Sequence, residues 1–145
     1  LLDQLVQASE YDLSIQIVGE TEMARLNQLH LGHEGSTDVI TLDYGDPVAN
    51  AMASVSANGK RTQFSFAGEL MVCADEAVIQ ARRFRVHWTN ELVRYCVHGV
   101  LHLCGHDDRA ASARRRMKSA EDRLMATLAR RFDLRKLARK TKVSA

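Results

Sequence analysis

The stretch HGVLHLCGHDD, residues 98–108, combines the pattern of a metal-binding helix with that of a sharp turn. His98 and His102 are four residues apart, so on an α-helix their imidazoles lie on the same face. This spacing is typical of the first two nitrogen ligands of a zinc ion. Gly105 is the residue type that most readily takes the left-handed conformation found just past a helix end. The stretch therefore predicts a helix that ends near residue 104 and carries a metal site on its last turns.

Two residues compete for the place of third ligand. Asp108 lies beyond the turn and can return toward the histidines with a carboxylate oxygen. His106 would share their face only if the helix continued past Gly105, which glycine disfavours, so we favour Asp108. Asp107 is expected to cap the next helix or to orient a ligand. Three protein ligands leave a fourth position for water, as in catalytic zinc sites; the alternative is a pair of partly buried, hydrogen-bonded histidines without metal.

The same stretch resembles the signature of the YbeY family of metal-dependent endoribonucleases, H-G-x-L-H-L-x-G-Y-D-H. The matching residues are His98, Gly99, Leu101, His102, Leu103, Gly105 and Asp107. His106 stands where the family has tyrosine, and Asp108 stands where it has a third histidine, so this site would be richer in oxygen. Further similarities lie at Leu26-Asn27, at residues 36–41 (STDVIT), at Gly68-Glu69-Leu70, and at Met117 and Glu121. Leu31 replaces an arginine that the family carries before its Thr-Asp pair, here Thr37-Asp38.

The resemblance implies a zinc-dependent, single-strand-specific endoribonuclease that acts in maturation of the 3′ end of small-subunit ribosomal RNA and in ribosome quality control. It implies one Zn²⁺ per chain, with another divalent metal as the alternative. The implied partners are ribosomal RNA and the ribosome small subunit or a ribosomal protein. Catalysis would pass through the metal held by His98, His102 and Asp108, with His106 or Asp107 assisting as acid or base.

Two other functions stay open. The departures at Leu31 and Asp108 favour a non-catalytic ribosome-assembly factor that binds RNA or a ribosomal protein and holds a structural metal. A metalloprotease is disfavoured, because proteases with this helix spacing carry a glutamate directly after the first histidine as general base, and here that position is Gly99. Glu69 and Glu121 are expected to support a strand and a helix as packed polar groups.

Length and composition fit one domain. A chain of 145 residues with 46% hydrophobic and 26% charged residues is ordinary for a single globular core. It has no apolar run of the roughly 20 residues that cross a bilayer and no signal peptide, so no membrane partner is expected. Its three cysteines have no paired spacing, which favours reduced thiols in the cytoplasm, with Cys96 and Cys104 as packing residues. Compared with the family, an opening strand and part of the first helix are expected to be missing.

The net charge of +2 does not by itself indicate nucleic acid, but the arginines flank the predicted site. Guanidinium groups bind phosphate through paired hydrogen bonds, so these residues are candidate RNA contacts. The candidates are Arg82, Arg83, Arg109 and Arg115. The basic run over residues 130–142 is interpreted as a solvated helix end.

Hydrophobic periodicity predicts the remaining elements. Strands are expected over 12–18, 38–44 and 61–73, and helices over 20–31, 74–85, 89–104 and 109–132. Residues 45–60, with the turn pair Asn58-Gly59, are expected to form a loop, and Thr89 is expected to cap its helix. The strand over 38–44 is predicted at the sheet edge, where an RNA strand could lie. These elements predict an α+β fold: a small mixed β-sheet packed with helices, with the metal-binding helix at its centre.

Overall fold

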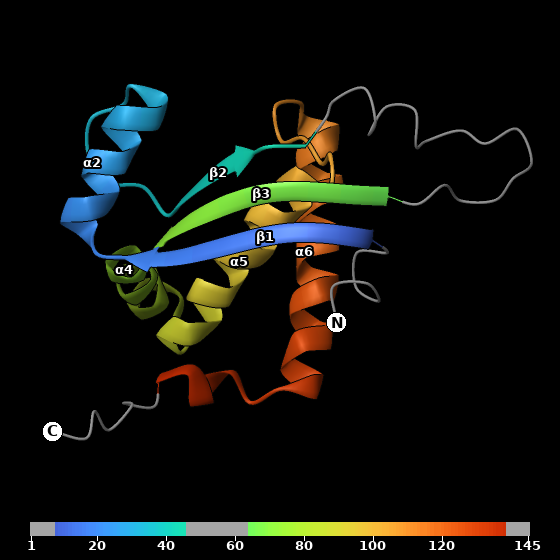
Figure 1. The fold of residues 1–145 in the computed structure, drawn as a ribbon. Coiled ribbons are helices and arrows are strands. Elements are labelled where there is room, and N and C mark those ends of the chain that lie inside the picture. The colour runs from blue at the N-terminus through green and yellow to red at the C-terminus, as the bar shows by residue number, and fades with distance from the viewer. Residues whose placement is uncertain (1–7, 46–63, 139–145) are drawn as a thin grey trace, which may run out of the picture.

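The computed structural model describes residues 8–45 and 64–138 and has an α+β architecture, as predicted (Figure 1). The predicted turn at Asn58-Gly59 lies outside the described residues. Within the two described ranges, no helix has the length and apolar content to cross a membrane. The elements in chain order are β1 (Ala8–Val18), α2 (Glu20–Leu31), β2 (Val39–Asp43), β3 (Phe64–Cys73), α4 (Ala74–Phe84), α5 (Trp88–Leu103), α6 (Ala111–Arg131) and the 3₁₀ helix η1 (Leu134–Ala138).

The sheet is mixed and small. Its described strands have the order β1-β3-β2, in which β1 runs parallel to β3 and β2 runs antiparallel to it. β2 therefore lies at an edge of the described sheet, as its sequence predicted. In Figure 1, α5 and α6 lie on one side of the strands, while α2 lies at the far end.

The helix that carries the two histidines is central to the packing. One side of α5 packs on the sheet, where Val100 and Leu103 meet Leu70 and Val72 of β3. Its other side packs on α6, in a cluster that contains Leu101. α2 covers the opposite face of the sheet with Met23 and Leu26. α5 is thus held between the sheet and α6, and its position is set by both.

Two glycines allow α5 to approach the sheet closely. A Cβ built at Gly99 would lie 2.5 Å from Cδ2 of Leu70, and one at Gly68 would lie 2.5 Å from Cδ2 of Leu103. Real Cβ atoms do not pack at such distances, so a larger residue at either position has to displace the leucine side chain or move the helix away from the sheet. Residue 99 faces the sheet and has no room for a long side chain. This explains why the position holds glycine and not the glutamate that a protease of this spacing carries.

Two local expectations are wrong. The alternation of polar and apolar residues over 12–18 predicts a strand with one buried face, yet Ile15 is 45% and Ile17 is 60% exposed. The alternation in its sequence is real, but β1 is an edge strand, and α5 packs on β3 and β2 instead. Thr89 does not cap α5: the N-cap is His87, whose Nδ1 accepts from the backbone N–H of Thr89 at 3.4 Å. The helix begins earlier because the imidazole takes the acceptor role expected of the hydroxyl.

Candidate metal centre

The last two turns of α5 and the loop that follows bring three predicted ligands together. One ligand atom each from His98, His102 and Asp108 lies within 4.8 Å of the other two. The two Nε2 atoms are 3.2 Å apart, and Nε2 of His102 is 3.7 Å from Oδ2 of Asp108. All three residues are half-buried. The group is therefore open to solvent on one side and supported by protein on the other.

The turn that returns Asp108 is the one that Gly105 predicted. Gly105 has a φ of 89°, in the left-handed region, and the N–H of His106 donates to the carbonyl of Leu101 at 3.0 Å. This is the hydrogen bond that closes a helix in the Schellman motif. Nη1 of Arg114 then donates to the carbonyl of Asp108 at 3.1 Å. The loop is thus fastened at both ends.

In the neutral form of the two imidazoles, their hydrogen bonds leave both Nε2 atoms as acceptors. Nδ1 of His102 lies 3.1 Å from the carbonyl oxygen of His106, and Nδ1 of His98 lies 3.1 Å from Oε2 of Glu121. Since carbonyl and carboxylate oxygens only accept, each Nδ1 carries the proton and donates it. Two lone pairs then face each other at 3.2 Å, an arrangement that a cation stabilises. Tetrahedral zinc with Zn–N distances of about 2.0–2.1 Å places its nitrogens about 3.3–3.4 Å apart, so the donors fit this metal.

Glu121 is a packed polar group of α6, as expected, and it also contacts a candidate ligand of this centre. Its side chain is buried on α6; Oε2 accepts from His98, and Oε1 accepts from Arg94 at 2.7 Å. Burial would raise the pKa of Glu121, but the hydrogen bonds from His98 and Arg94 outweigh it and lower the pKa. The same hydrogen bond raises the pKa of His98. A carboxylate behind a ligating histidine fixes its tautomer and orientation.

A signal for Glu121 was present in the sequence. Met117 and Glu121 are four residues apart, so they share a face of α6, and the methionine side of that face is buried. A carboxylate on a buried face needs a partner, but only the packing of α6 on α5 identifies it as His98. Glu69 has the expected supporting role: it accepts from Gln16 of β1 and from Tyr44 at 3.1 Å, next to β2.

The two residues considered as acid or base lie beside the centre. Oδ1 of Asp107 accepts from the N–H of Arg109 at 3.0 Å, and this hydrogen bond lowers the pKa of Asp107. Asp107 thus stabilises the loop before α6, whose N-cap, Ala110, has no side-chain cap. His106 supplies its carbonyl to His102, and burial lowers the pKa of its ring. Burial also raises the pKa of the Cys104 thiol to about 11, consistent with a packing residue.

The Thr37-Asp38 pair has a local role in the turn before β2. Oδ1 of Asp38 accepts from the N–H of Val39 at 2.8 Å and from the hydroxyl of Thr37 at 3.2 Å. The hydrogen bond to Glu121 is the main cause of the raised pKa of His98, and the charge of Asp38 adds to it. Leu31, at the end of α2, offers no cation, and Arg25 pairs with Glu22 at 2.7 Å.

The four arginines considered as RNA contacts divide into two pairs. Arg109 lies on the loop and is 91% exposed, and Arg115 is exposed on the early part of α6. Arg82 and Arg83 end α4, just before α5 begins. His102 lies about 20 Å further along α5 at 1.5 Å per residue. The first pair therefore lies on the loop and helix that follow Asp108, and the second pair lies at the opposite end of the metal helix.

Together, the mixed sheet, the histidine helix and the returning carboxylate define an α+β protein with a candidate metal site that is open to solvent. The chain matches the family model described as Endoribonuclease YbeY over residues 1–129, and it belongs to the YbeY family. It is 36% identical over 110 residues to Endoribonuclease YbeY of Chlorobium phaeobacteroides, covering 76% of this chain and 68% of that protein. It is 28% identical over 127 residues to Endoribonuclease YbeY of Bordetella avium, covering 87% of this chain and 70% of that protein.

A solved structure supports the fold. The solution structure of a Thermotoga maritima protein superposes with a TM-score of 0.61, covering 99% of this chain and 87% of that chain, at 20% sequence identity. The similarity confirms the predicted architecture.

Replacing Glu121 by glutamine is expected to weaken zinc binding about 10–100-fold, the usual effect of losing a partner behind a ligand. An amide has one acceptor, whereas the carboxylate accepts from both His98 and Arg94. Asp122→Asn is the matched control, because Asp122 also pairs with Arg94, at 3.0 Å, but is not among the partners of His98. Competition with a zinc-binding dye measures both affinities, and equal affinities in the two variants would contradict the role of Glu121.

Proposed function

We propose that this chain is a zinc-dependent endoribonuclease that cuts single-stranded RNA. The observation that carries the proposal is the pair of Nε2 acceptors 3.2 Å apart with the Asp108 carboxylate beside them. The relatives of this chain are named Endoribonuclease YbeY, which supports RNA as the substrate and hydrolysis as the reaction.

Zinc supplies Lewis-acid polarisation of a phosphoryl oxygen and an activated water near neutral pH. His98, His102 and Asp108 would hold the ion, and Glu121 would keep His98 in the required tautomer. Gly99 supplies no general base. Burial lowers the pKa of His106, which favours the neutral form of its ring. We retain His106 and Asp107 as candidate assisting groups.

We further propose that the substrate is ribosomal RNA, at the 3′ end of the small-subunit species, with the small subunit or one of its proteins as partner and a role in ribosome quality control. The basis is membership of the YbeY family. A cytoplasmic location is part of this proposal. It is supported by the free thiols of Cys73, Cys96 and Cys104, which suit a reducing compartment.

A non-catalytic assembly factor is the second candidate, favoured by the absence of a cation at Leu31. Such a protein would hold its metal in a closed shell of four protein ligands. The candidate group in the described part of the chain contains three side chains, which supports a site with room for water instead.

The decisive experiment compares a single-stranded RNA, its duplex and the matching single-stranded DNA as substrates for zinc-loaded protein. We expect cleavage of the single-stranded RNA alone, loss of cleavage in a chelator and recovery when zinc is restored. RNA binding without cleavage at saturating zinc would contradict the nuclease proposal and support the non-catalytic assembly factor. Cleavage by the protein that persists at the same rate in the chelator would overturn the metal-dependent mechanism.

A further inference from the structure

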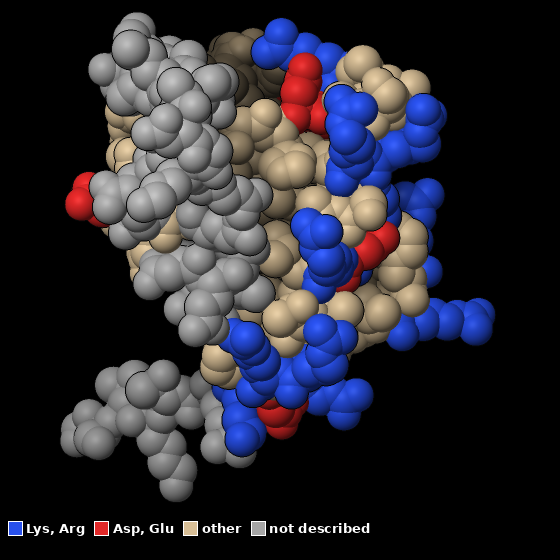
Figure 2. All heavy atoms as spheres, turned by 90° about the vertical axis from the view of Figure 1, so that its right-hand side faces the viewer, with Lys and Arg blue, Asp and Glu red and all other residues tan. Residues whose placement is uncertain are grey.

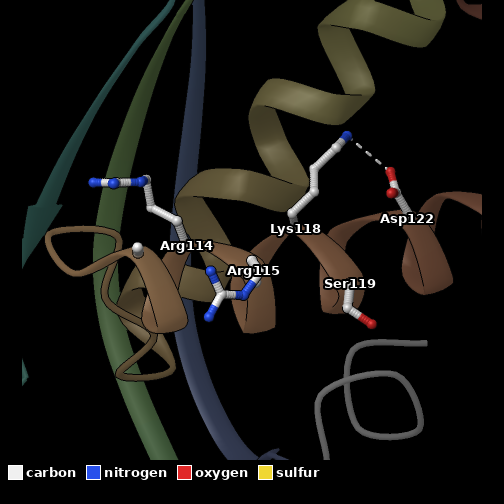
Figure 3. Close-up of a pocket in the computed structure, with 6 residues that line it drawn as sticks. Arg114, Arg115, Lys118, Ser119 and Asp122 are labelled. Atoms are coloured by element: carbon white, nitrogen blue, oxygen red, sulfur yellow. Dashed lines mark hydrogen bonds and ion pairs between the residues drawn. The ribbon is translucent and has the colours of Figure 1, made fainter.

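A shallow hollow of about 660 Å³ lies on α6, next to the loop that carries Asp108 (Figure 3). Its lining residues recur at spacings of three and four, so they form one face of the helix. Figure 3 shows the arginine, lysine and serine side chains projecting from this face. The lining residues are Ala111, Arg114, Arg115, Lys118, Ser119 and Asp122.

The hollow carries an excess of positive charge. Its one carboxylate, Asp122, is neutralised by Lys118 at 2.9 Å and by Arg94 at 3.0 Å. Arg114 and Arg115 form no ion pair with any residue that the structure describes. The first turn of α6 contains no acidic residue, so the positive end of the helix dipole adds to the field of the arginines. The chemistry of the hollow therefore fits an anion.

One wall of the hollow is joined to the metal centre. Nη1 of Arg114 donates to the carbonyls of Asp108 and Arg109, at 3.1 and 3.0 Å. A guanidinium has five N–H donors, so most of those of Arg114 stay available to a ligand, as do those of Arg115. Arginine groups of this kind bind phosphate through paired, charge-assisted hydrogen bonds. An anion in the hollow would lie beside the loop that presents the third ligand.

The positive surface continues around α6. Arg115 and Ser119 also line a second hollow of about 450 Å³, together with Arg116, Arg123 and His106. Arg116 and Arg123 are seven residues apart, or about 10 Å along the helix. Figure 2 shows lysine and arginine side chains along the right-hand and lower parts of this view, where they outnumber the acidic side chains. Repeated cations at this spacing suit a chain of phosphates better than a single small anion.

We propose that the two hollows form a phosphate-binding track that holds single-stranded RNA next to the metal centre, with Arg115 at its middle. This inference rests on the proposed function, since it assigns the path of the same substrate. RNA is favoured over a protein partner because the lining offers guanidinium groups and hydroxyls but no large apolar anchor of the kind that dominates protein interfaces. The α6 track comprises Arg114, Arg115, Arg116, Lys118, Ser119 and Arg123.

The test measures RNA binding separately from cleavage. The double variant Arg115→Gln/Arg116→Gln removes two exposed track cations that form no ion pair with a described residue. It leaves Arg114, which holds the loop, and Lys118, which pairs with Glu121 and Asp122. Arg82→Gln/Arg83→Gln is the matched control, because it removes the same charge from exposed arginines at the far end of α5. The probe is a fluorescent 12-nucleotide oligouridine with 2′-O-methyl groups, titrated with zinc-loaded protein at several salt concentrations, and its length is checked on a gel after each titration. Zinc content confirms that the metal centre is intact.

Each phosphate contact on a single strand contributes about 0.7 to the slope of log affinity against log salt. The track variant is expected to lose about 1.4 from this slope and to bind about 25-fold more weakly at 0.1 M salt if binding is equal at 1 M. The control variant should retain the slope of the unmodified protein. Equal losses in both variants would show a general charge effect and overturn the track, as would an unchanged slope in the track variant.

The binding experiment and the cleavage experiment fail separately. If the protein never cuts RNA but the track variant has a smaller salt slope, the phosphate-binding track is supported and the nuclease proposal is wrong. If the protein cuts RNA with zinc but the track variant keeps the full salt slope, the nuclease proposal is supported and the track is wrong.

Discussion

His102→Ala is expected to abolish zinc-dependent RNA cleavage and to weaken zinc binding about 100–1,000-fold. Structural zinc sites bind with about 10–16 kcal/mol, so one of four ligands contributes about 3–4 kcal/mol, and about 1.4 kcal/mol changes affinity tenfold. Nε2 of His102 is the donor nearest to both other ligands, at 3.2 Å from His98 and 3.7 Å from Asp108. Removal of this imidazole leaves only His98 and Asp108 to bind the ion.

Isothermal titration with zinc measures the affinity, and a labelled single-stranded RNA measures cleavage. His30→Ala is the control, because His30 is exposed at the end of α2 and lies outside the ligand group. It should bind zinc and cut RNA like the unmodified chain. If His102→Ala retained full zinc affinity, the metal would lie elsewhere and the proposed centre would be wrong.

Gly68→Ala is expected to lower the free energy of unfolding by about 3 kcal/mol, at the upper end of the cost of overpacking a core. Its Cβ would lie 2.5 Å from Cδ2 of Leu103 and 2.7 Å from the backbone oxygen of Leu42. The leucine side chain can rotate, but the carbonyl belongs to β2, which pairs with β3 at this position. The new methyl group therefore has to separate either the strands or the metal helix from the sheet.

Thermal unfolding followed by circular dichroism checks this prediction. About 3 kcal/mol corresponds to a fall in Tm of about 6–12 °C for a domain near this size. Ser65→Ala, an exposed position on the same strand, should change stability by less than about 0.5 kcal/mol. Gly99→Ala should cost less than Gly68→Ala, because its contacts at 2.5–3.1 Å are with side-chain atoms of Leu70 and Thr41. Equal stability of Gly68→Ala and Ser65→Ala would contradict the close approach of α5 to the sheet.

The sequence by itself determined what depends on neighbours along the chain. The spacing of His98 and His102 places their rings on one helix face, and Gly105 ends that helix and lets Asp108 return, because the geometry of a helix and its end is set within a few residues. For the same reason, periodicity predicted the helices, the strands and the mixed α+β class.

Tertiary structure alone decided what depends on distant segments. Glu121 pairs with His98 across 23 residues only because α6 packs on α5. The sequence of β1 alternates polar and apolar residues, but Ile15 and Ile17 stay exposed because β1 lies at the sheet edge. A sequence pattern shows which residues share a face, but only packing decides what that face meets.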